Sequence, residues 1–454
     1  MASRPFKELF AIPLRNGLTK PKAVRGAGTK MVNMGELFAN PRVVNVTMDR
    51  VPLNQTERSS SLLAAGDLLF ARQSLVLSGA GKCSIFVGDD EDVCFESHVI
   101  RCRLNQELAD PHFYYYFFSS PAGRTLIESI VEQGAGASGI RGSDLAELSL
   151  PWINPTVQRR VASVLSQIDD KIDINRRINQ TLEAMAQAIF KSWFVDFDPV
   201  KAKIAAKAED RDPLRAAMTA ISGKSDAELD ALPPEQYAQL AATASLFPDD
   251  MEESELGEIP RGWGYSTVGD SFILTMGQSP PGDTYNESGE GLPFYQGRTD
   301  FGFRFPSQRV FCTAPTRFAE LGDTLISVRA PVGDVNMALE KCCLGRGVAG
   351  VRHPKGYRSI VFYSLRELRS RFDTFDSEGT VFGSINKKDF QALPVIQPPI
   401  GVLAAFERIV TPMDQRVIEN EKQTRTLATL RDTLLPKLLS GELSVTDTMA
   451  EAEA

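Results

Sequence analysis

Cysteine and histidine are the residues of this sequence whose chemistry would be easiest to identify, as metal ligands or as a nucleophile with its base. The 454-residue chain carries Cys83, Cys94, Cys102, Cys312, Cys342, Cys343, His98, His112 and His353. No C-x-x-C pair occurs, so the ligand spacing typical of structural zinc is missing. We therefore predict no metal site and reduced, mostly buried thiols. The scattered histidines also indicate no Ser/His/Asp centre, so no catalytic residue is predicted.

Glycine-rich loops that could cradle a phosphate occur at three places. Two G-x-G-x-x-G matches, at 134–139 and 345–350, do not stand between a strand and a helix, as nucleotide binding requires. SGAGKCS at 78–84 resembles a phosphate loop, but Val76 and Cys83 occupy positions where that loop needs glycine and Ser or Thr. We predict turns here, and no cofactor bound by this chain.

Basic residues are concentrated in one stretch of a chain whose formal net charge is -8. Residues 302–371 hold 12 basic and 5 acidic residues, whereas residues 201–258 hold 6 basic and 13 acidic ones. Affinity for nucleic acid follows the phosphates neutralised locally and not the charge of the whole chain. The basic stretch therefore indicates either a phosphate-facing surface or a solvated, strand-rich surface, and charge alone leaves both open.

Polar residues beside glycine-rich turns are the candidates for contact with nucleic acid, because Arg, Lys, Asn and Gln can hydrogen-bond base edges. Base contact is predicted for Gln278, Tyr285, Gln296, Arg298 and Arg329, and at comparable places earlier in the chain for Asn33, Arg72, Gln73 and Lys82. Phosphate contact is predicted for Arg304, Arg309, Arg346 and Arg352. For each of these residues, an ordinary surface ion pair is the alternative.

An internal repeat is found when the chain is moved along itself by 245 residues. Residues 138–194 then align without a gap with residues 383–439. The matched pairs include Asp144 with Asp389, Asp169 with Asp414, and Asn175 with Asn420. The blocks before them resemble each other more weakly: GDLLFARQ at 66–73 and GDTLISVRAP at 322–331 each place an arginine after a Gly-Asp turn and an apolar strand.

Both copies carry apolar residues at alternating steps of four and three, the period of a coiled-coil seam. The predicted seam residues are Val161, Leu165, Ile168, Ile172, Asn175, Leu182 and Ile189, then Phe406, Val410, Met413, Val417, Asn420, Leu427 and Leu434. Neither helix can bury its stripe alone, and a whole domain separates the two, so we expect an antiparallel pair. Asn175 and Asn420 are predicted to fix its register, the alternative being two exposed asparagines near a bend.

The chain thus divides into alternating domains and helices. The predicted segments are a domain at 1–152, a long helix at 153–200, an acidic Ala-rich linker with short exposed helices at 201–258, a second domain at 259–397, a second long helix at 398–441 and a disordered acidic tail at 442–454. Short β-rich runs broken by Gly and Pro make each domain α+β. No apolar run approaches the roughly 20 residues of a membrane span, and no signal peptide is recognised, so we predict a cytoplasmic chain without membrane contact.

This organisation resembles the specificity (S) subunits of type I restriction–modification systems. The resemblance rests on the long helix and its exit at 158–203, LFPDDMEESELGEIPRGW at 246–263, GQSPPGDTYNESGEGLPFYQGRTDFG at 277–302, GDTLISVRAPVGDVNMALEKCCLGRGVAG at 322–350 and LLPKLLSGEL at 434–443. These segments occur in the order in which the family carries them. The departures lie near the first domain, which begins without the Ile-Pro-x-Gly-Trp found at 259–263 and ends in an unusual Asn-Pro-Thr-Val-Gln at 154–158.

The resemblance implies an α+β fold: two α/β target-recognition domains separated by two long helices in an antiparallel coiled coil, with an internal pseudo-twofold repeat. It implies that each domain reads half of an asymmetric, bipartite site in double-stranded DNA. Two modification (methyltransferase) subunits would dock on the helix pair, and restriction (motor–nuclease) subunits would join them. S-adenosylmethionine, ATP and Mg are then expected on the partner subunits, and no cofactor on this chain.

Two other functions stay open at this stage. One is a coiled-coil adaptor that docks proteins without reading DNA, whose DNA binding would lack the steep salt dependence of a DNA reader. The other is an enzyme with an unrecognised site. Adenine methyltransferases carry Asn/Asp-Pro-Pro-Tyr/Phe, but the nearest match is Gln397-Pro398-Pro399-Ile400, which lacks the stacking ring. We interpret that match as the stop before the second helix.

Overall fold

The structure is a computed structural model that describes residues 2–134, 136–255, 257–377 and 383–443. The chain forms two compact units: unit 1 comprises Met1–Ile174 and Gln423–Ala454, and unit 2 comprises Asn175–Lys422. The chain passes from one unit to the other within two long helices, α6 (Pro155–Phe194) and α15 (Ile400–Ser440). Within the described ranges, no helix is long and apolar enough to cross a membrane.

Unit 1 is a mixed α+β structure. Its strands are β1 (Ala2–Pro5), β2 (Phe10–Asn16), β3 (Thr29–Val32), β4 (Arg42–Val44), β5 (Asp49–Val51), β6 (Leu68–Ala71), β7 (Gln73–Ser74), β8 (Cys83–Gly88), β9 (Val93–Phe95), β10 (Val99–Leu104), β11 (Glu132–Gln133), β12 (Ser138–Gly139) and β13 (Ser149–Trp152). Its shorter helices are α1 (Met34–Ala39), α2 (Gln55–Ser61), α3 (Pro111–Ser119), α4 (Pro121–Glu128) and α5 (Gly142–Glu147), with 3-10 turns η1 (Phe6–Leu9), η2 (Lys22–Val24) and η3 (Leu77–Gly79). The central sheet has the order β2-β10-β6-β8-β4.

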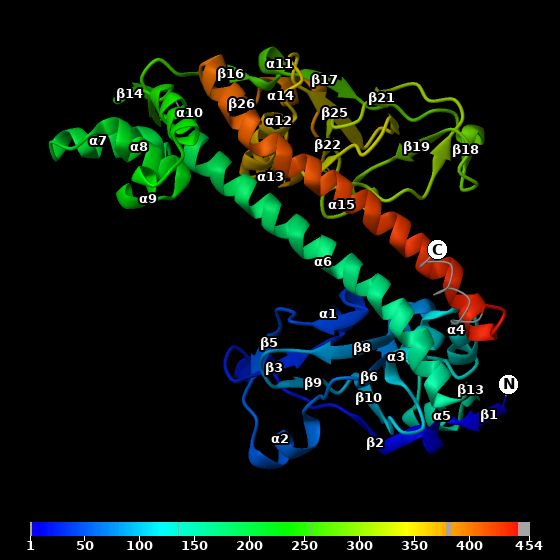
Figure 1. Cartoon of the computed structure of the whole chain (residues 1–454). Helices are drawn as coiled ribbons and strands as arrows, with labels where there is room; N and C mark the ends of the chain where they lie inside the picture. The colour runs from blue at the N-terminus through cyan, green and yellow to red at the C-terminus, as the bar shows by residue number, and fades with distance from the viewer. Residues whose placement is uncertain (1, 135, 256, 378–382, 444–454) are drawn as a thin grey trace. The chain divides into compact units, whose positions relative to one another are not determined.

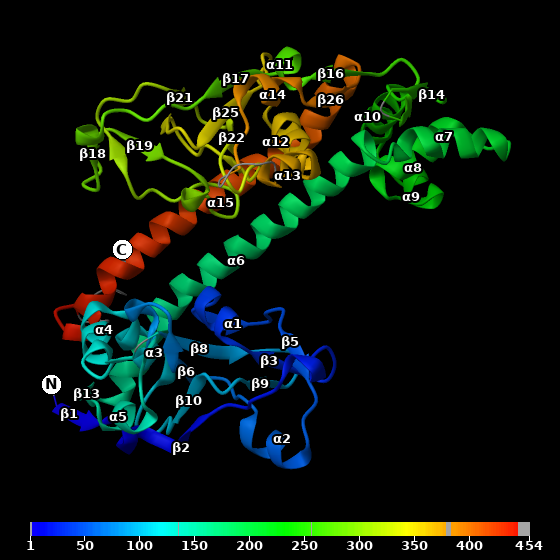
Figure 2. The same ribbon diagram turned by 180° about the vertical axis from the view of Figure 1, so that it is seen from behind.

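The aromatic run of unit 1 forms α3, and its rings are part of the core. Tyr114 and Tyr116 are fully or almost fully buried, and the rings of Phe70 and Phe118 meet edge to face at 5.0 Å. The same core includes Leu165 of α6, so α3 lies between the sheet and the long helix (Figures 1 and 2). Burying large aromatic rings against both layers supplies much of the driving force for this packing.

Unit 2 repeats this plan with more short helices. Its strands are β14 (Met251–Ser254), β15 (Gly257–Pro260), β16 (Gly264–Thr267), β17 (Ile273–Met276), β18 (Tyr285–Asn286), β19 (Leu292–Tyr295), β20 (Phe311–Cys312), β21 (Phe318–Ala319), β22 (Thr324–Ser327), β23 (Val335–Met337), β24 (Cys342–Leu344), β25 (Val348–Arg352) and β26 (Pro394–Gln397). Its shorter helices are α7 (Asp198–Ala208), α8 (Pro213–Ser222), α9 (Asp226–Asp230), α10 (Pro234–Ser245), α11 (Val268–Ser271), α12 (Arg358–Glu367), α13 (Arg369–Ser377) and α14 (Lys387–Ala392), with 3-10 turns η4 (Gly282–Thr284) and η5 (Arg298–Asp300).

The sheets of the two units share a strand order, which extends the repeat beyond the helices. The order β17-β25-β22-β23 in unit 2 corresponds to β2-β10-β6-β8 in unit 1, and β16 pairs with β26 as β1 pairs with β13. The predicted fold, two α+β domains of one plan with long helices, is confirmed. All six cysteines are buried and free, as expected for structural thiols.

The segment expected to be a linker of exposed helices is instead packed. Helices α7 to α10 gather into one bundle (Figure 2) with its own small core, in which Ala217, Met218 and Leu229 are fully buried. Lys203 donates a hydrogen bond to the carbonyl oxygen of Phe247 at 2.6 Å, and the rings of Trp193 and Phe247 meet at 5.0 Å. We expected exposed helices because the segment is acidic overall. Its few apolar residues are nevertheless enough to form a core.

The long helices run antiparallel within each unit. In unit 2, Asn179 donates to the carbonyl of Val417 at 3.4 Å, and the rings of Phe190 and Phe406 lie 5.9 Å apart further along. In unit 1, Leu165 shares a core with Leu435. Every residue predicted for the seam is buried or half-buried. The predicted tail lies outside the described residues from position 444 onward.

Candidate nucleic-acid interface

In each unit a buried aspartate fixes the start of the central strand. Asp67 accepts hydrogen bonds from Arg103 on β10 at 2.7 Å, and Asp323 accepts one from Arg352 on β25 at 2.5 Å. Burial raises the pKa of Asp323, and the guanidinium beside it opposes that shift. These two Gly-Asp turns are therefore equivalent. Arg352, predicted as a phosphate contact, is half-buried and holds this turn.

At the far end of these strands in unit 2, four turns converge. The amide of Gln278 donates to Leu344 O at 2.9 Å, that of Gly345 to Tyr295 O at 2.8 Å, and that of Val328 to Gly347 O at 3.0 Å. The glycines permit this close approach, since a Cβ added to Gly347 would lie 2.3 Å from the carbonyl oxygen of Gln296. The G-x-G-x-x-G match is thus a crossing point of loops.

These turns display side chains that are available to a ligand. Gln278, Gln296, Arg329 and Arg346 are all exposed, and within the described ranges their side chains have no hydrogen-bond or ion-pair partner. Arg298 is exposed beside them and is ion-paired with Asp334. The structure therefore brings five of the predicted contacts to one edge, which we name the unit 2 edge.

The same backbone hydrogen bonds recur in unit 1. Leu18 N donates to Phe95 O at 2.8 Å, Glu96 N to Val32 O at 3.0 Å, and Arg72 N to His98 O at 2.8 Å. Val32 thus corresponds to Tyr295, which makes the next residue, Asn33, the equivalent of Gln296. We name the turns at 16–18, 33, 72–74 and 96–98 the unit 1 edge.

The arginines that follow the two Gly-Asp strands are not equivalent. Ile140 N donates to Arg72 O at 3.0 Å, and the matched Ile385 N donates to Val328 O at 3.1 Å. Arg72 therefore corresponds to Val328, and Gln73 corresponds to Arg329. Neighbouring strand residues point to opposite faces, so a shift of one residue changes which side chain faces the ligand.

In unit 1 the predicted residues differ in how far their side chains already interact with other parts of the protein. Gln73 is exposed and, with the half-buried Arg72, lines a cavity of about 380 Å³ together with Asn16, Gln133 and Arg141. Asn33 caps α1 and accepts a hydrogen bond from Arg25 at 3.0 Å. Lys82 donates to the carbonyl of Phe38 at 2.9 Å, and burial lowers the pKa of its amine. Gln73 and Arg72 are therefore better candidates for base contact than Asn33 and Lys82.

The remaining predicted residues of unit 2 have structural partners. The hydroxyl of Tyr285 donates to Pro280 O at 2.7 Å and its ring packs on Phe294. Arg309 is exposed but pairs with Asp300 at 2.6 Å. Arg304 is only 2% exposed, which does not fit the predicted phosphate contact.

Arg304 belongs to a buried ionic cluster that joins the sheets and short helices of unit 2 to the long helices. Its guanidinium lies 3.5 Å above the ring of Phe362 and donates to Asp414 on α15 at 2.7 Å. It also pairs with Glu183 on α6 at 3.5 Å, and Glu183 pairs in addition with Arg366. One signal for this cluster was present in the sequence, namely the repeat that pairs Asp414 with Asp169.

Asp169 plays the equivalent part in unit 1. It accepts hydrogen bonds from the hydroxyl of Tyr116 on α3 at 2.6 Å and from Arg431 on α15 at 2.8 Å. Burial, with the carboxylate of Asp169 beside it, raises the pKa of the Tyr116 hydroxyl. In both units a helix aspartate therefore anchors the recognition fold, with different partners.

The asparagines of the seam are buried and hydrogen-bonded. Asn175 donates to Asn420 O at 3.5 Å, and Asn420 donates to the side chain of Asn179 at 2.9 Å. Asn175 and Asn420, the residues matched by the repeat, thus contact each other.

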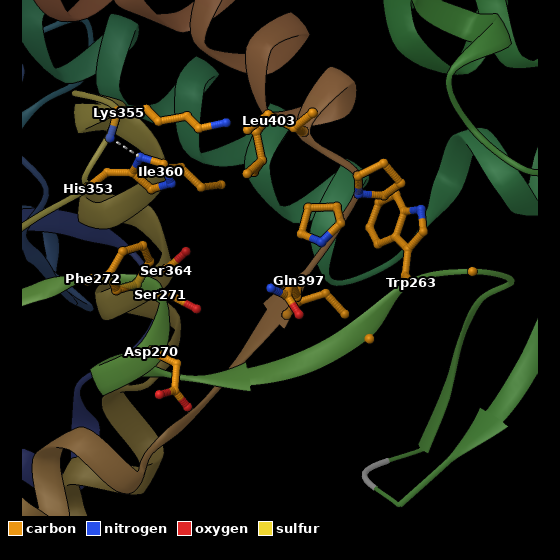
Figure 3. A pocket seen from close by; sticks show the side chains of 16 residues that line it. Trp263, Asp270, Ser271, Phe272, His353, Lys355, Ile360, Ser364, Gln397 and Leu403 are labelled. Carbon is orange, nitrogen blue, oxygen red and sulfur yellow. Dashed lines mark hydrogen bonds between the residues drawn. The ribbon is translucent and has the colours of Figure 1, made fainter.

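Unit 2 also holds a cavity of about 610 Å³, lined by Trp263, His353, Gln397 and the two prolines before α15 (Figure 3). His353 accepts a hydrogen bond from the backbone amide of Lys355, and burial lowers the pKa of its imidazole. Asp270 and Ser271 also line this cavity. Within the described ranges, no three His, Cys, Asp or Glu side chains are grouped so that they could hold a metal ion.

Comparison with known proteins finds similarity to specificity subunits of type I restriction enzymes. A family profile described as type I restriction modification DNA specificity domain matches residues 2–184. The chain is 26% identical over 449 residues to a putative type I restriction enzyme specificity subunit, MjaX, of Methanocaldococcus jannaschii, covering 97% of this chain and 93% of that protein. It is 28% identical over 417 residues to the HindI specificity subunit of Haemophilus influenzae, covering 85% and 88%.

A solved structure is similar in fold. The type I restriction-modification system S subunit from M. genitalium aligns over 96% of this chain and 95% of its own, with a TM-score of 0.55 and 17% identity.

Proposed function

Because this chain is similar over most of its length to type I restriction–modification specificity subunits, we propose that it is such a subunit and that its two edges read the two halves of one bipartite DNA site. The observation that carries the proposal is the equivalence of the edges: one set of backbone hydrogen bonds displays Asn33 and Gln73 in unit 1, and Gln296 and Arg329 in unit 2. Different side chains at equivalent positions favour different bases, so the site is asymmetric.

Base contact is proposed for the exposed residues without partners, Gln73, Gln278, Gln296 and Arg329, together with Arg72. Arginine prefers guanine and glutamine prefers adenine in bidentate contacts, so Arg329 and Gln73 differ in the base they favour. Arg346, Arg298 and Arg309 are proposed as phosphate contacts, the last two after exchanging a carboxylate for a phosphate. Arg304 and Arg352 are left out because they hold the fold.

The helix pair is the proposed docking surface for two modification subunits, through which restriction subunits join. This part of the proposal is supported by the length of α6 and α15, which each run for about 40 residues. Each helix uses only one stripe of its surface for packing. In this proposal the partner subunits hold S-adenosylmethionine, ATP and Mg, and the complex acts on DNA in the cytoplasm. The homologues imply that this chain is itself a non-catalytic subunit.

Mapping of adenine methylation across the source genome, with and without this chain, tests the proposal. Loss of one asymmetric, gapped motif on deletion is the expected result. An unchanged methylome, together with DNA binding that does not weaken as salt rises, would favour the protein-docking adaptor instead.

A further inference from the structure

Three consecutive apolar side chains project from the unit 1 edge into solvent. Leu75 is 89% exposed, Val76 60% and Leu77 47%, and in the described part of the chain no other run of three large apolar residues is so exposed. Single exposed apolar residues are common on protein surfaces, but a contiguous set indicates a binding surface. We name these residues the apolar tip.

The apolar tip is held by an ordered turn. Val76 N donates to Ser74 Oγ at 3.2 Å, and Gly79 N donates to Val76 O at 3.0 Å. From outside the turn, the guanidinium of Arg124 donates to the carbonyl of Ser78 at 3.0 Å. A turn fixed in this way can present apolar side chains to a ligand without first paying an ordering cost.

The position of the tip indicates what it contacts. It directly follows Gln73 and β7, so it continues from the residue that is equivalent to Arg329. Arg124 on α4 donates to the turn, and Arg72 and Arg141 line the cavity beside Gln73, where Arg141 pairs with Glu132. An exposed apolar turn next to a residue proposed to contact bases matches the apolar wedges that other proteins insert between base pairs.

Among the residues that the structure describes, the unit 2 edge has no such tip. After Arg329 the chain turns back at once: Ala330 N donates to Gly383 O at 2.8 Å, Gly333 N to Ser327 O at 2.9 Å, and Val332 is fully buried. The feature is therefore confined to one of the two equivalent edges.

We propose that the apolar tip inserts into the DNA beside the half-site read by unit 1 and unstacks one base-pair step there. The inference rests on the proposed function, because it needs DNA to lie along the unit 1 edge. It adds a consequence that base reading alone does not require, namely that the bound DNA has an extra unstacked step at one half of the site, besides any adenine that the modification subunits flip out for methylation.

The test uses the full chain in complex with its modification subunits and a duplex that carries the mapped methylation motif. Each adenine of the motif and its flanks is replaced in turn by 2-aminopurine, whose fluorescence rises when it is unstacked. The methylated adenines and their immediate neighbours are left unchanged, because base flipping would unstack them in both half-sites. We expect a rise only in or beside the half-site that Gln73→Ala alters. The double variant Leu75→Ser/Leu77→Ser should lose that rise while methylating the same motif.

A matched control is Ile12→Ser, which removes a part-exposed apolar side chain from β2 of the same unit and should keep the rise. The absence of any rise with the unchanged complex would overturn the proposal, as would a rise that survives in the double variant. Loss of the modification subunits from the double variant would also overturn it, because the tip would then bind protein. Failure of the proposed function is seen separately, as a methylome that does not depend on this chain.

Discussion

The two units share one backbone arrangement but carry different side chains at equivalent positions. At their edges the backbone is equivalent, turn for turn, while Gln73 stands where Arg329 stands and Asn33 where Gln296 stands. At their bases a helix aspartate anchors each recognition fold, but Asp169 binds a tyrosine and a part-exposed arginine, whereas Asp414 shares the fully buried Arg304 with Glu183. The backbone and the position of the anchor are thus kept, whereas the side chains proposed to read DNA and those that stabilise each unit differ.

The largest effect is expected from breaking the unit 2 anchor. Arg304→Ala leaves Glu183 with one partner fewer and Asp414 without its cation, and an uncompensated buried charge costs about 3–5 kcal/mol of unfolding free energy. Urea unfolding followed by tryptophan fluorescence measures this, since Trp193 and Trp263 are in unit 2.

The equivalent change in unit 1, Arg431→Ala, should cost only about 1.5–3 kcal/mol, because Asp169 keeps the hydrogen bond from Tyr116. Arg261→Ala, which breaks an exposed ion pair with Asp250, serves as the control and should cost about 1 kcal/mol or less. Equal costs for Arg304→Ala and Arg431→Ala would contradict the difference between the anchors.

The next effect concerns the reading edges. Arg329→Ala should weaken binding to the cognate duplex by about 1–3 kcal/mol, and should weaken binding to DNA with an altered unit 2 half-site far less. Competition binding of the complex to the two duplexes gives both values. A uniform loss for all sequences would instead identify Arg329 as a phosphate contact.

A smaller effect is expected at Arg346, whose exposed side chain is proposed to neutralise a phosphate. Arg346→Ala should weaken binding to all sequences alike and reduce the slope of log K against log salt by about 1. Titrations at several salt concentrations measure that slope. Lys355→Ala, at an exposed position of the same unit, is the control with an unchanged slope; a sequence-dependent loss at Arg346 would argue for base contact.

The smallest effect is a dependence of stability on pH, and it comes from Glu407 in unit 2. Glu407 on α15 is buried where the repeat places Ala162, and burial raises the pKa of its carboxyl. A raised folded-state pKa means that the folded protein binds the proton more tightly than the unfolded chain, so stability falls as pH rises above about 4.5, the usual glutamate value.

Glu407→Gln should remove this part of the pH dependence, because the amide oxygen can still accept the hydrogen bond from Ile360 N. Unfolding curves across that pH range compare the variant with the unchanged chain. The same slope in both would show that Glu407 does not titrate as described.

Much of the fold follows from the sequence because periodicity and repetition are properties of the chain itself. The seam of α6 and α15, the match between Asp169 and Asp414, and the burial of the aromatic run were all open to prediction. The site was predicted less well. The offset between Arg72 and Arg329 depends on hydrogen bonds to Ile140 and Ile385, which no spacing reveals.

Burial explains the clearest error. Arg304 stands in the most basic stretch, and local charge predicts a surface residue, but its partners Glu183 and Asp414 are 121 and 110 positions away in the sequence. In the same way, short helices were predicted at 201–258 but their packing into a core was not, because acidic residues dominate the composition of a segment whose core needs few apolar side chains.

The most direct test of the central claim, that each edge reads its own half of the site, is methylome mapping with single-edge variants. Cells would carry the unchanged chain, Gln73→Ala or Arg329→Ala, and long-read sequencing would report every methylated adenine. The account predicts that each variant relaxes one half of the gapped motif, a different half in each case. The account would be contradicted if both variants relaxed the same half of the motif, or if neither variant relaxed either half.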